Sequence, residues 1–396
     1  MELKPVSMTP IVGMDNRSDD AELWARGEAP SLRVRDARNV DVLGDGRIRM
    51  RAGWRRITAA PYRDLWQNPL HGDLFGRLGD EWVRIISLGD GQHEALVEAG
   101  PGGYTHTQLN NKVLMASPAG VWSFDGAAAQ PLGIGRPAGP VLEVGAGSLP
   151  AGRYGACVAW VRDGLESGTS EAVFADVPEQ GALTVTSPLC LEPGVSSARI
   201  YVTACNGGEF RLAAEVALGV SESFMLPPPA GRPPMFHSME PMPGGVYLQP
   251  WRGRIVTARA NVLRFSQPLA YHVHDPIRDH VTMPQRITFV VAMEGGLWVG
   301  QRDRVLFLAG AQPAELQVRT HHAGAPVPGS ALLALPGELS GELGQSALAL
   351  WLSEYGYAAG TADGDAFNVQ KSALAGLSGA SGTSVVLGQR AYTSVN

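Results

Sequence analysis

Short apolar runs separated by polar turns are the main pattern of this chain. Residues 295–310, GGLWVGQRDRVLFLAG, show it most clearly, with one apolar run on either side of the polar residues 301–304. Apolar runs of about five residues are too short for a helix and suit a buried strand. We therefore predict a β-hairpin here, with Arg302, Asp303 and Arg304 in a solvated turn.

Six further segments repeat this pattern of a short apolar run, a polar turn and a second run with an aromatic residue. They are GDGRIRMRAGWRRI (44–57), DLFGRLGDEWVRII (73–86), NNKVLMASPAGVWSFDG (110–126), WRGRIVTARANVLRFSQ (251–267), LALWLSEYGYAAGTADG (348–364) and TSVVLGQRAYTSV (383–395). Most are separated by about 35–55 residues, and about 40–50 residues is the period of a β-propeller blade. Blades that stack on both sides need strands that are apolar on both faces, whereas an outer strand alternates, as RIRMR at 47–51 does.

The repeat predicts an all-β fold, a degenerate β-propeller of about six or seven blades. A β-sandwich or a chain of separate sheets remains the alternative. Five tryptophans lie inside the hairpins and are expected in the core; they are Trp54, Trp82, Trp122, Trp298 and Trp351. One spacing, from residue 126 to residue 251, is much longer than the others and indicates an insertion of roughly 95 residues.

The inserted segment, residues 138–229, predicts a small antiparallel β-sandwich. It contains six or seven short strands with turns every 8–12 residues or so. Residues 153–162 and 171–177 read as strands joined through a turn at Asp163-Gly164, and Gly207-Gly208 marks a second hairpin. We therefore expect a first propeller segment at 1–137, the sandwich at 138–229 and a second propeller segment at 230–396.

Charge distinguishes the insert from the rest of the chain. Residues 138–229 contain 4 Lys/Arg and 10 Asp/Glu, whereas 1–137 contain 16 and 17, and 230–396 contain 12 and 11. The flanks PLGIGRPAGP and LPPPAGRPP are rich in Pro and Gly, as linkers between domains are. We expect an acidic module that projects into solvent or meets a partner, and that does not contact DNA phosphates.

Composition narrows the class of protein further. No run of 18 apolar residues is present, so we expect no membrane span, and the first 20 residues lack the apolar core of a signal peptide. The three cysteines, Cys157, Cys190 and Cys205, lack metal-ligand spacing and fit free thiols in a reducing cytoplasm.

Several polar clusters of the sequence are candidate catalytic or ligand-binding sites. HVHDPIRDH (272–280) offers His272, His274, Asp275 and His280 as metal ligands, with His321 or His322 from elsewhere, but a polar loop that begins at Asp275-Pro276 is the preferred interpretation.

Asp363 and Asp365 could form a glycosidase pair, yet they lie in a turn sequence, TADGDAF. The five arginines of 47–56 could line a DNA path, but in an alternating strand they form a solvated face. We predict no catalytic residues, no cofactor and no metal, and hence no enzyme.

The residues also resemble a known family. GMDNRSDD (13–20) followed by LRVRDARNVDVLGDGRIRMRAGWRRI (32–57) is similar to the amino-terminal region of a group of bacteriophage tail proteins. Residues 262–310, which include PQRIT and EGGLWVG, and residues 349–369 are similar to the central region of the same group. The motifs are loose individually, and their order along the chain is the specific part. The insert resembles fibronectin type III-like modules.

This resemblance implies a virion structural protein, similar to the tail nozzle or packaged-DNA-stabilisation proteins of short-tailed phages. It implies a ring of copies, with six expected from tail symmetry, that continues or gates the DNA conduit below the portal and adaptor. The expected partners are the chain itself, adaptor or portal proteins and tail fibres, while packaged DNA passes without specific binding. The expected location is the virion tail, assembled in the cytoplasm of the bacterial host. The alternative is a receptor- or glycan-binding propeller at the tail tip.

Overall fold

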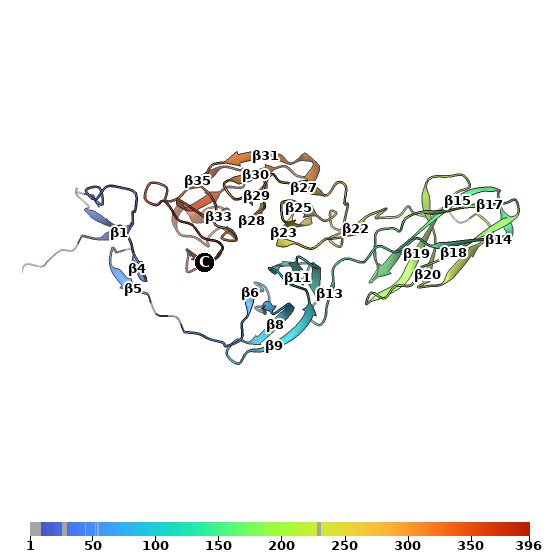
Figure 1. The fold of residues 1–396 in the computed structure, drawn as a ribbon, viewed down its shortest axis with the longest axis horizontal. Coiled ribbons are helices and arrows are strands. Elements are labelled where there is room, and N and C mark those ends of the chain that lie inside the picture. The colour runs from blue at the N-terminus through green and yellow to red at the C-terminus, as the bar shows by residue number, and fades with distance from the viewer. Residues whose placement is uncertain (1–8, 26–29, 44, 52, 54, 228–230) are drawn as a thin grey trace, which may run out of the picture. The chain divides into compact units, whose positions relative to one another are not determined.

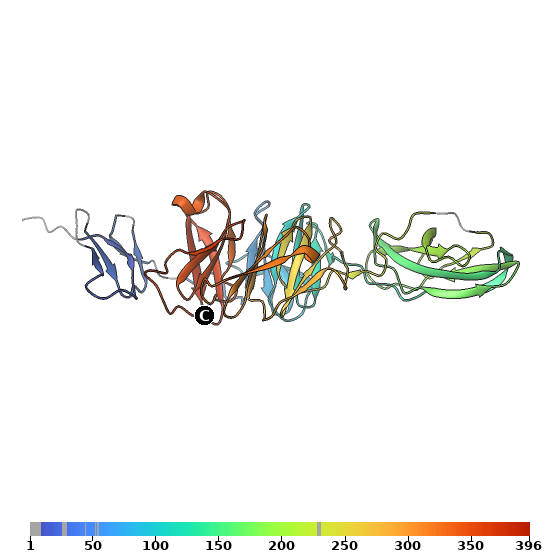
Figure 2. The same cartoon turned by 90° about the horizontal axis from the view of Figure 1, so that it is seen from above.

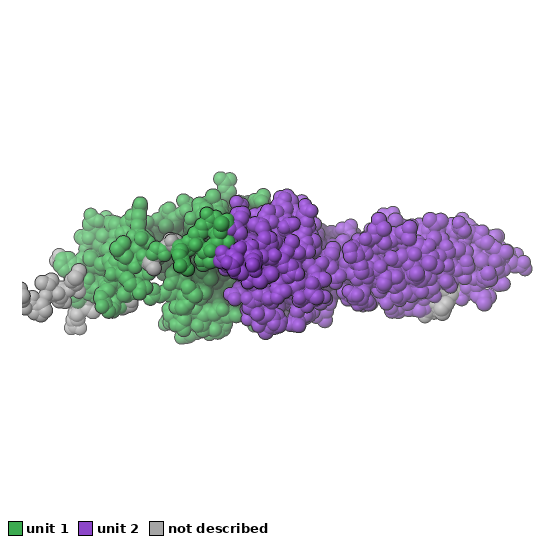
Figure 3. Space-filling view, turned by 90° about the horizontal axis from the view of Figure 1, so that it is seen from below, with its two compact units in different colours: residues 1–59, 284–396 green, residues 60–283 purple. Residues whose placement is uncertain are grey.

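The computed structural model describes residues 9–25, 30–43, 45–51, 53, 55–227 and 231–396 (Figure 1). These residues form 37 β-strands and two short 3-10 helices, Pro313–Glu315 and Gly341–Gly344, so the all-β prediction is confirmed. No helix in this part of the chain is long and apolar enough to cross a membrane. The chain divides into two compact units, residues 1–59 with 284–396 and residues 60–283 (Figure 3). The domain boundaries expected from the repeat, after residues 137 and 229, do not coincide with the limits of these two units and stay a prediction.

Unit 2, residues 60–283, contains three antiparallel sheets of four strands. The first has β6 (Arg63–Gln67), β7 (Leu74–Leu78), β8 (Glu81–Ser87) and β9 (Gln92–Glu98). The second has β10 (Thr105–Leu109), β11 (Lys112–Ser117), β12 (Gly120–Phe124) and β13 (Ala129–Pro131), and the third has β23 (Val246–Trp251), β24 (Arg254–Arg259), β25 (Val262–Phe265) and β27 (His280–Thr282). Two further short strands of unit 2, β22 (Glu240–Pro241) and β26 (Val273–His274), pair with each other.

The middle sheet of unit 2 is buried on both faces. Val113 and Met115 of β11 pack into one core with the β8 residue Trp82, whereas Leu114 and Ala116 pack into a second core with the β24 residue Ile255. Successive side chains of a strand point to opposite faces, so a continuous apolar run supplies both cores. The two-faced apolar strands expected from the sequence are therefore present here.

The insert consists of two facing sheets within unit 2 (Figure 2 shows its long strands in green). One sheet has β14 (Val141–Leu149), β18 (Gly181–Thr186) and β21 (Ser221–Phe224). The other has β15 (Gly152–Arg162), β16 (Leu165–Glu166), β17 (Val173–Val177), β19 (Val195–Thr203) and β20 (Phe210–Ala217). Leu183 and Val185 from the first sheet share one buried core with Tyr154, Val158 and Ile200 from the second, as a sandwich requires.

The two turns expected in the insert have different outcomes. Asp163 and Gly164 both take positive φ, 51° and 77°, between β15 and β16, as a tight hairpin turn requires. The second hairpin, β19–β20, is present, but residues 204–209 connect it, and Asn206, rather than Gly207 or Gly208, has a positive φ of 56°. In this longer loop the Asn206 N–H donates to the Arg153 carbonyl of β15 (2.9 Å).

A buried carboxylate fixes the end of the insert. The side chain of Glu166 is 1% exposed and accepts hydrogen bonds from Arg199 (2.8 Å), Arg232 (2.6 Å) and the Tyr201 hydroxyl (2.6 Å). Arg232 belongs to the Pro/Gly-rich flank that follows the insert, and its guanidinium ties this flank to β16 and β19. A buried carboxylate needs such a full set of donors, because an unpaired charge in a protein interior is very costly.

Unit 1 contains two further four-stranded sheets and a C-terminal hairpin. They are β28 (Phe289–Met293), β29 (Gly296–Gly300), β30 (Val305–Ala309) and β31 (Gln317–His321); β32 (Leu332–Ala334), β33 (Leu348–Ser353), β34 (Gly356–Gly360) and β35 (Ala366–Asn368); and β36 (Gly382–Leu387) with β37 (Arg390–Val395). The hairpin predicted at 295–310 is confirmed, because β29 and β30 pair in register and residues 301–304 connect them.

Aromatic rings hold these two sheets together. The rings of Trp298 and Trp351 lie 5.5 Å apart, Phe289 stacks on Trp351 at 5.6 Å, and Trp298 contacts Phe307 at 4.9 Å. Trp82, Trp298 and Trp351 are 0% exposed and Trp122 is 9% exposed, as expected; Trp54 lies outside the described residues. Gly360 lets β34 lie directly against the indole of Trp298, because a Cβ at residue 360 would overlap that ring.

The N-terminal part of unit 1 corrects one prediction. β1 (Ile11–Met14), β3 (Ser31–Val34) and β2 (Trp24–Ala25) form a small sheet in which β1 and β3 are parallel, and β4 (Val40–Val42) pairs only with β5 (Ile48–Met50). Residues 47–51 were expected to form the outer strand of a blade. Instead, among the described residues, β4 and β5 form a two-stranded sheet rather than the edge of a four-stranded blade, and Ile48 and Met50 are 45% and 73% exposed.

Replacement of Trp351 by alanine tests the aromatic packing of unit 1. Removing a fully buried indole leaves a cavity, so we expect Trp351→Ala to lower the free energy of unfolding by about 3–5 kcal/mol. Val385→Ala is the control, because Val385 is 56% exposed on β36 and its loss should cost less than about 1 kcal/mol. Urea unfolding followed by tryptophan fluorescence measures both, and equal midpoints for the two variants would contradict this packing.

Candidate functional site

Two of the histidines considered as metal ligands, His272 and His274, have structural roles. His272 and His274 are 5% and 4% exposed, and one ring nitrogen of each contacts a backbone carbonyl. His272 Nε2 lies 3.0 Å from the Glu166 carbonyl oxygen, and His274 Nδ1 lies 2.8 Å from the Phe265 carbonyl oxygen. Burial lowers the pKa of both imidazoles, so they are neutral near pH 7. The part of the chain that the structure describes contains no group of three or more His, Cys, Asp or Glu placed to hold a metal.

The loop that carries these histidines is more buried than the polar loop expected from the sequence. Asp275 accepts hydrogen bonds from the N–H groups of Ile277 (2.9 Å) and Arg278 (3.2 Å), as a turn at Asp-Pro should. Asp279 is 4% exposed and pairs with Arg254 at 3.0 Å. His280 is exposed on β27. These contacts hold the loop against β24 and β25, which accounts for its burial.

The other polar clusters also have structural surroundings. Asp363 and Asp365 are exposed in the turn between β34 and β35, where the Asp365 N–H donates to the Thr361 hydroxyl (3.1 Å). In the arginine-rich segment, Arg47 pairs with Asp45 and Arg51 pairs with Asp41, so acids outside the strip neutralise part of its charge.

The three cysteines are free thiols. Cys157 is buried, and desolvation raises the pKa of its thiol to about 12. Cys190 and Cys205 are partly exposed. A thiol with a raised pKa is a poor nucleophile, so Cys157 is part of the core.

The motif at 13–18 forms a link between the two ends of the chain, which we call the terminal clasp (residues 15–17 with 371–375). Asn16 makes three hydrogen bonds of 2.9 Å: its N–H donates to the Ala373 carbonyl, its side-chain amide donates to the Ala375 carbonyl, and its side-chain oxygen accepts from the Ala375 N–H. Arg17 donates to the carbonyl of Lys371. One asparagine thus holds the N-terminal sheet to the segment after β35.

Asp15 orders the turn that presents Asn16. It is 3% exposed and accepts hydrogen bonds from the N–H groups of Ser18 and Arg17, both at 3.0 Å, and from the Ser18 hydroxyl at 2.9 Å. These donors, with Arg33 3.6 Å away, hold the pKa of the Asp15 carboxyl below its usual range. The carboxylate form therefore fixes the loop in the shape that the clasp needs.

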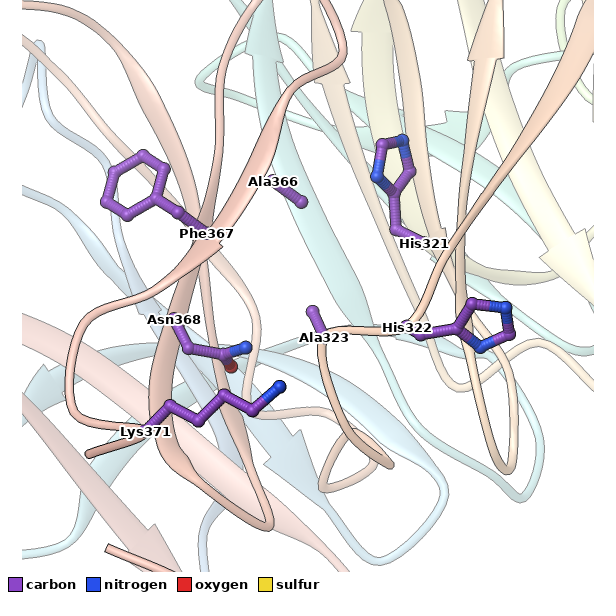
Figure 4. Close-up of a pocket in the computed structure, with 7 residues that line it drawn as sticks. All are labelled: His321, His322, Ala323, Ala366, Phe367, Asn368 and Lys371. Carbon is purple, nitrogen blue, oxygen red and sulfur yellow. The ribbon is translucent and has the colours of Figure 1, made fainter. Parts of the chain in front are cut away.

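A groove borders the clasp at Lys371 (Figure 4). It has a volume of about 340 Å³ and is lined by His321, His322, Ala323, Ala366, Phe367, Asn368 and Lys371. The histidines lie at the end of β31 and the residues 366–368 form β35, so the groove separates the outer strands of two adjacent sheets. In Figure 4 the side chains of Asn368 and Lys371 point into the groove and Phe367 points away from it.

Lys371 brings one positive charge to the lining of the groove. The Lys371 ammonium lies 5.3 Å from the centre of the Tyr355 ring, on which Arg17 also rests at 5.8 Å. His321 packs on Trp298 at 5.0 Å, and its Nε2 is buried without a hydrogen-bond partner in the described chain. Desolvation lowers the pKa of His321. The lining residues include no carboxylate and no Ser or Cys nucleophile, so this arrangement suits binding rather than covalent chemistry.

The sequence signalled little of this site. The sequence singles out residues 13–20 only for their resemblance to the phage tail group, and nothing in that stretch identifies residues 373–375 as its partner. His321 and His322 were considered only as ligands for a metal at residues 272–280, whereas the structure places them beside Lys371 and Asn368. A run of polar residues at the end of an outer strand is the one signal that could have pointed to the groove.

Asparagine 16 provides the test of the clasp. In Asn16→Ala the two side-chain hydrogen bonds to Ala375 are lost, so we expect hydrogen exchange of the Ala375 amide to become at least about tenfold faster. Ser18→Ala is the control, since it removes only one of the three hydrogen bonds to Asp15. Mass spectrometry of peptides covering 371–377 measures the effect, and unchanged exchange in Asn16→Ala would show that the clasp does not hold this segment.

Comparison with known proteins adds only distant likenesses. No family model and no curated protein matches the chain. Among solved structures it is similar to the "AfRom2 CNH domain", at 9% identity and a TM-score of 0.25, over 79% of this chain and 85% of that one. It is also similar to "BBS1N in complex with ARL6DN", at 12% identity and a TM-score of 0.20, over 76% and 92% of the two chains. Likenesses of this size carry no argument about function.

Proposed function

We propose that the chain is a structural protein of the tail of a short-tailed bacteriophage, which forms a ring of copies around the tail axis. In this role it continues or gates the DNA conduit below the portal and adaptor and performs no catalysis. Its location is the virion tail, assembled in the cytoplasm of the bacterial host.

The fold that fits this role is a degenerate β-propeller of about six or seven blades with a fibronectin type III-like insert. The support is local. Within unit 2 the sheet β10–β13 shares one core with the sheet β6–β9 and a second core with β23–β27. Within unit 1 the sheet β32–β35 shares cores with β28–β31 and with the hairpin β36–β37. Face-to-face stacking of consecutive four-stranded sheets is how propeller blades pack.

The observation that carries the proposal is the terminal clasp. The stretch GMDNRS resembles the start of the phage tail group, and in this chain three of its residues, Asp15, Asn16 and Arg17, have defined structural roles. A chance resemblance would not be expected to coincide with a stretch that links the N-terminal sheet to residues 371–375. The motif therefore has a use that is architectural, as expected of a structural protein.

The N-terminal sheets supply a surface for contact between copies. Val12, Trp24, Ile48, Met50 and Ile57 are between 45% and 73% exposed. A two-stranded hairpin such as β4–β5 is marginal in isolation, and an interface between copies would cover its exposed apolar side chains, Ile48 and Met50. A second copy of the chain that covers this region would close a head-to-tail ring, for which six copies match tail symmetry.

The expected partners follow from the same role. Adaptor or portal proteins lie above such a ring and tail fibres lie beside it. The segments 1–137 and 230–396 are nearly neutral, with 16 basic against 17 acidic residues and 12 against 11. DNA would pass such a surface without specific binding, because tight binding to phosphates needs a strong excess of basic side chains.

Native mass spectrometry of the purified chain tests the ring. We expect a mass near six times the 41.9 kDa of the chain. Met50→Asp should shift the population toward the monomer, since it places a charge in the apolar contact. Ile277→Asp, at a side chain that is 81% exposed in unit 2, should leave the mass unchanged. A wild-type chain that stays at 41.9 kDa as its concentration is raised would contradict the proposal.

A receptor- or glycan-binding role at the tail tip is the second candidate, and the groove beside Lys371 favours it. Its volume of about 340 Å³ suits a single sugar ring, and it offers the Asn368 amide and the Lys371 ammonium as donors. A glycan array probed with the wild-type chain tests this candidate. Binding that Lys371→Ala abolishes and the exposed-site control Lys112→Ala retains would support it, and an array without signal would overturn it.

A further inference from the structure

A second groove in unit 1 includes residues 377–379, which follow the clasp in sequence, and has no role in the proposed ring. It has a volume of about 370 Å³ and is lined by Arg286, Thr288, Arg302, Ala325, Pro326, Val327, Pro328, Leu377, Ser378 and Gly379. Arg286 and Thr288 lie just before β28, Arg302 lies in the turn between β29 and β30, and the remaining residues form the facing wall. This groove differs from the first in that most of its lining is apolar.

Hydrogen bonds hold together the two backbone segments that carry the arginines. The Thr288 N–H donates to the Gly300 carbonyl at 2.9 Å, which continues the pairing of β28 with β29. Gln301 is 0% exposed, and its side-chain amide donates to the Gln285 carbonyl at 2.9 Å. The residues that carry Arg286 and Arg302 are thus fixed side by side, and Gln301 acts as a positioning residue for both.

The charge of this arginine pair is not compensated by the groove. Neither guanidinium has an ion pair or a hydrogen bond with another residue in the part of the chain that the structure describes. The neighbouring carboxylate, Asp303, pairs with Arg304 at 2.9 Å instead. On the facing wall, Glu354 accepts a hydrogen bond from the Ala325 N–H at 3.4 Å.

The groove also has an unused polar atom and an apolar wall. The hydroxyl of Thr288 is buried and has no hydrogen-bond partner among the described residues, although buried hydroxyls are usually paired. Pro326, Val327 and Leu377 provide apolar surface opposite the arginines. An apolar groove with a few convergent polar groups is the usual form of a small-ligand site.

We propose that this groove binds a carboxylate carried on an apolar body. A guanidinium offers paired donors that match the two oxygens of a carboxylate, and two adjacent guanidiniums can bind it together. The apolar body would lie against Pro326, Val327 and Leu377. The same chemistry is present in a free aromatic acid and in the C-terminal carboxylate of a peptide, so the two sources need separate probes.

Isothermal titration calorimetry on the full chain tests the site. We expect phenylacetate to bind and phenylacetamide, its neutral analogue, to give no heat of binding. Arg302→Met and Arg286→Met should each weaken phenylacetate binding by about tenfold or more, because each removes a charge-assisted hydrogen bond. Arg278→Met is the matched control, since Arg278 is exposed and does not line the groove. Equal melting temperatures of the variants establish that they fold.

Two short peptides that end in leucine, one with a free C-terminus and one amidated, distinguish the sources. Tighter binding of the free peptide than of phenylacetate, with none of the amidated form, would assign the site to a chain terminus. Binding of phenylacetate alone would assign it to a small acid. A flat titration with both carboxylates, or affinities that the Arg286→Met/Arg302→Met double variant leaves unchanged, would overturn the proposal.

Discussion

The structure depends on one constraint: a sheet of four short strands has two faces, and in the middle of each stack both faces must be buried. β11 satisfies this constraint, because Val113 and Met115 pack into one core and Leu114 and Ala116 pack into another. β33 does the same with Ala349 and Trp351 on one side and Leu348 and Leu350 on the other. No sheet of this kind is stable by itself, so each depends on its neighbours for the burial that holds it.

This packing decides where polar groups can act. Inside the stacks, polar side chains serve the fold, as His272 and His274 do when they bind backbone carbonyls and Glu166 does when it collects Arg199, Arg232 and Tyr201. Lys371 and Arg302, by contrast, lie in loops outside the strands, where strands end and turns meet. Both grooves of unit 1 lie at such places, one beside β31 and β35 and the other beside the turn at Arg302.

Local features of this fold could be predicted from the sequence, and features that depend on distant residues could not. The hairpin at 295–310 and the turn at Asp163-Gly164 were predictable because short apolar runs and turn residues act over a few positions. The alternation at 47–51 was misleading, since it does not reveal that β5 belongs to a two-stranded sheet rather than to a four-stranded blade. The clasp joins Asn16 to Ala375 across 359 residues, and no pattern near either residue signals the other.

The central claim of this account is that the chain is a ring-forming component of a phage tail rather than a peripheral binding protein. Cryo-electron microscopy of the virion, with the chain located by an antibody fragment, tests that claim most directly. The account predicts a ring of about six copies on the tail axis, below the portal and adaptor. Density for this chain only on peripheral fibres, away from the axis, would contradict it.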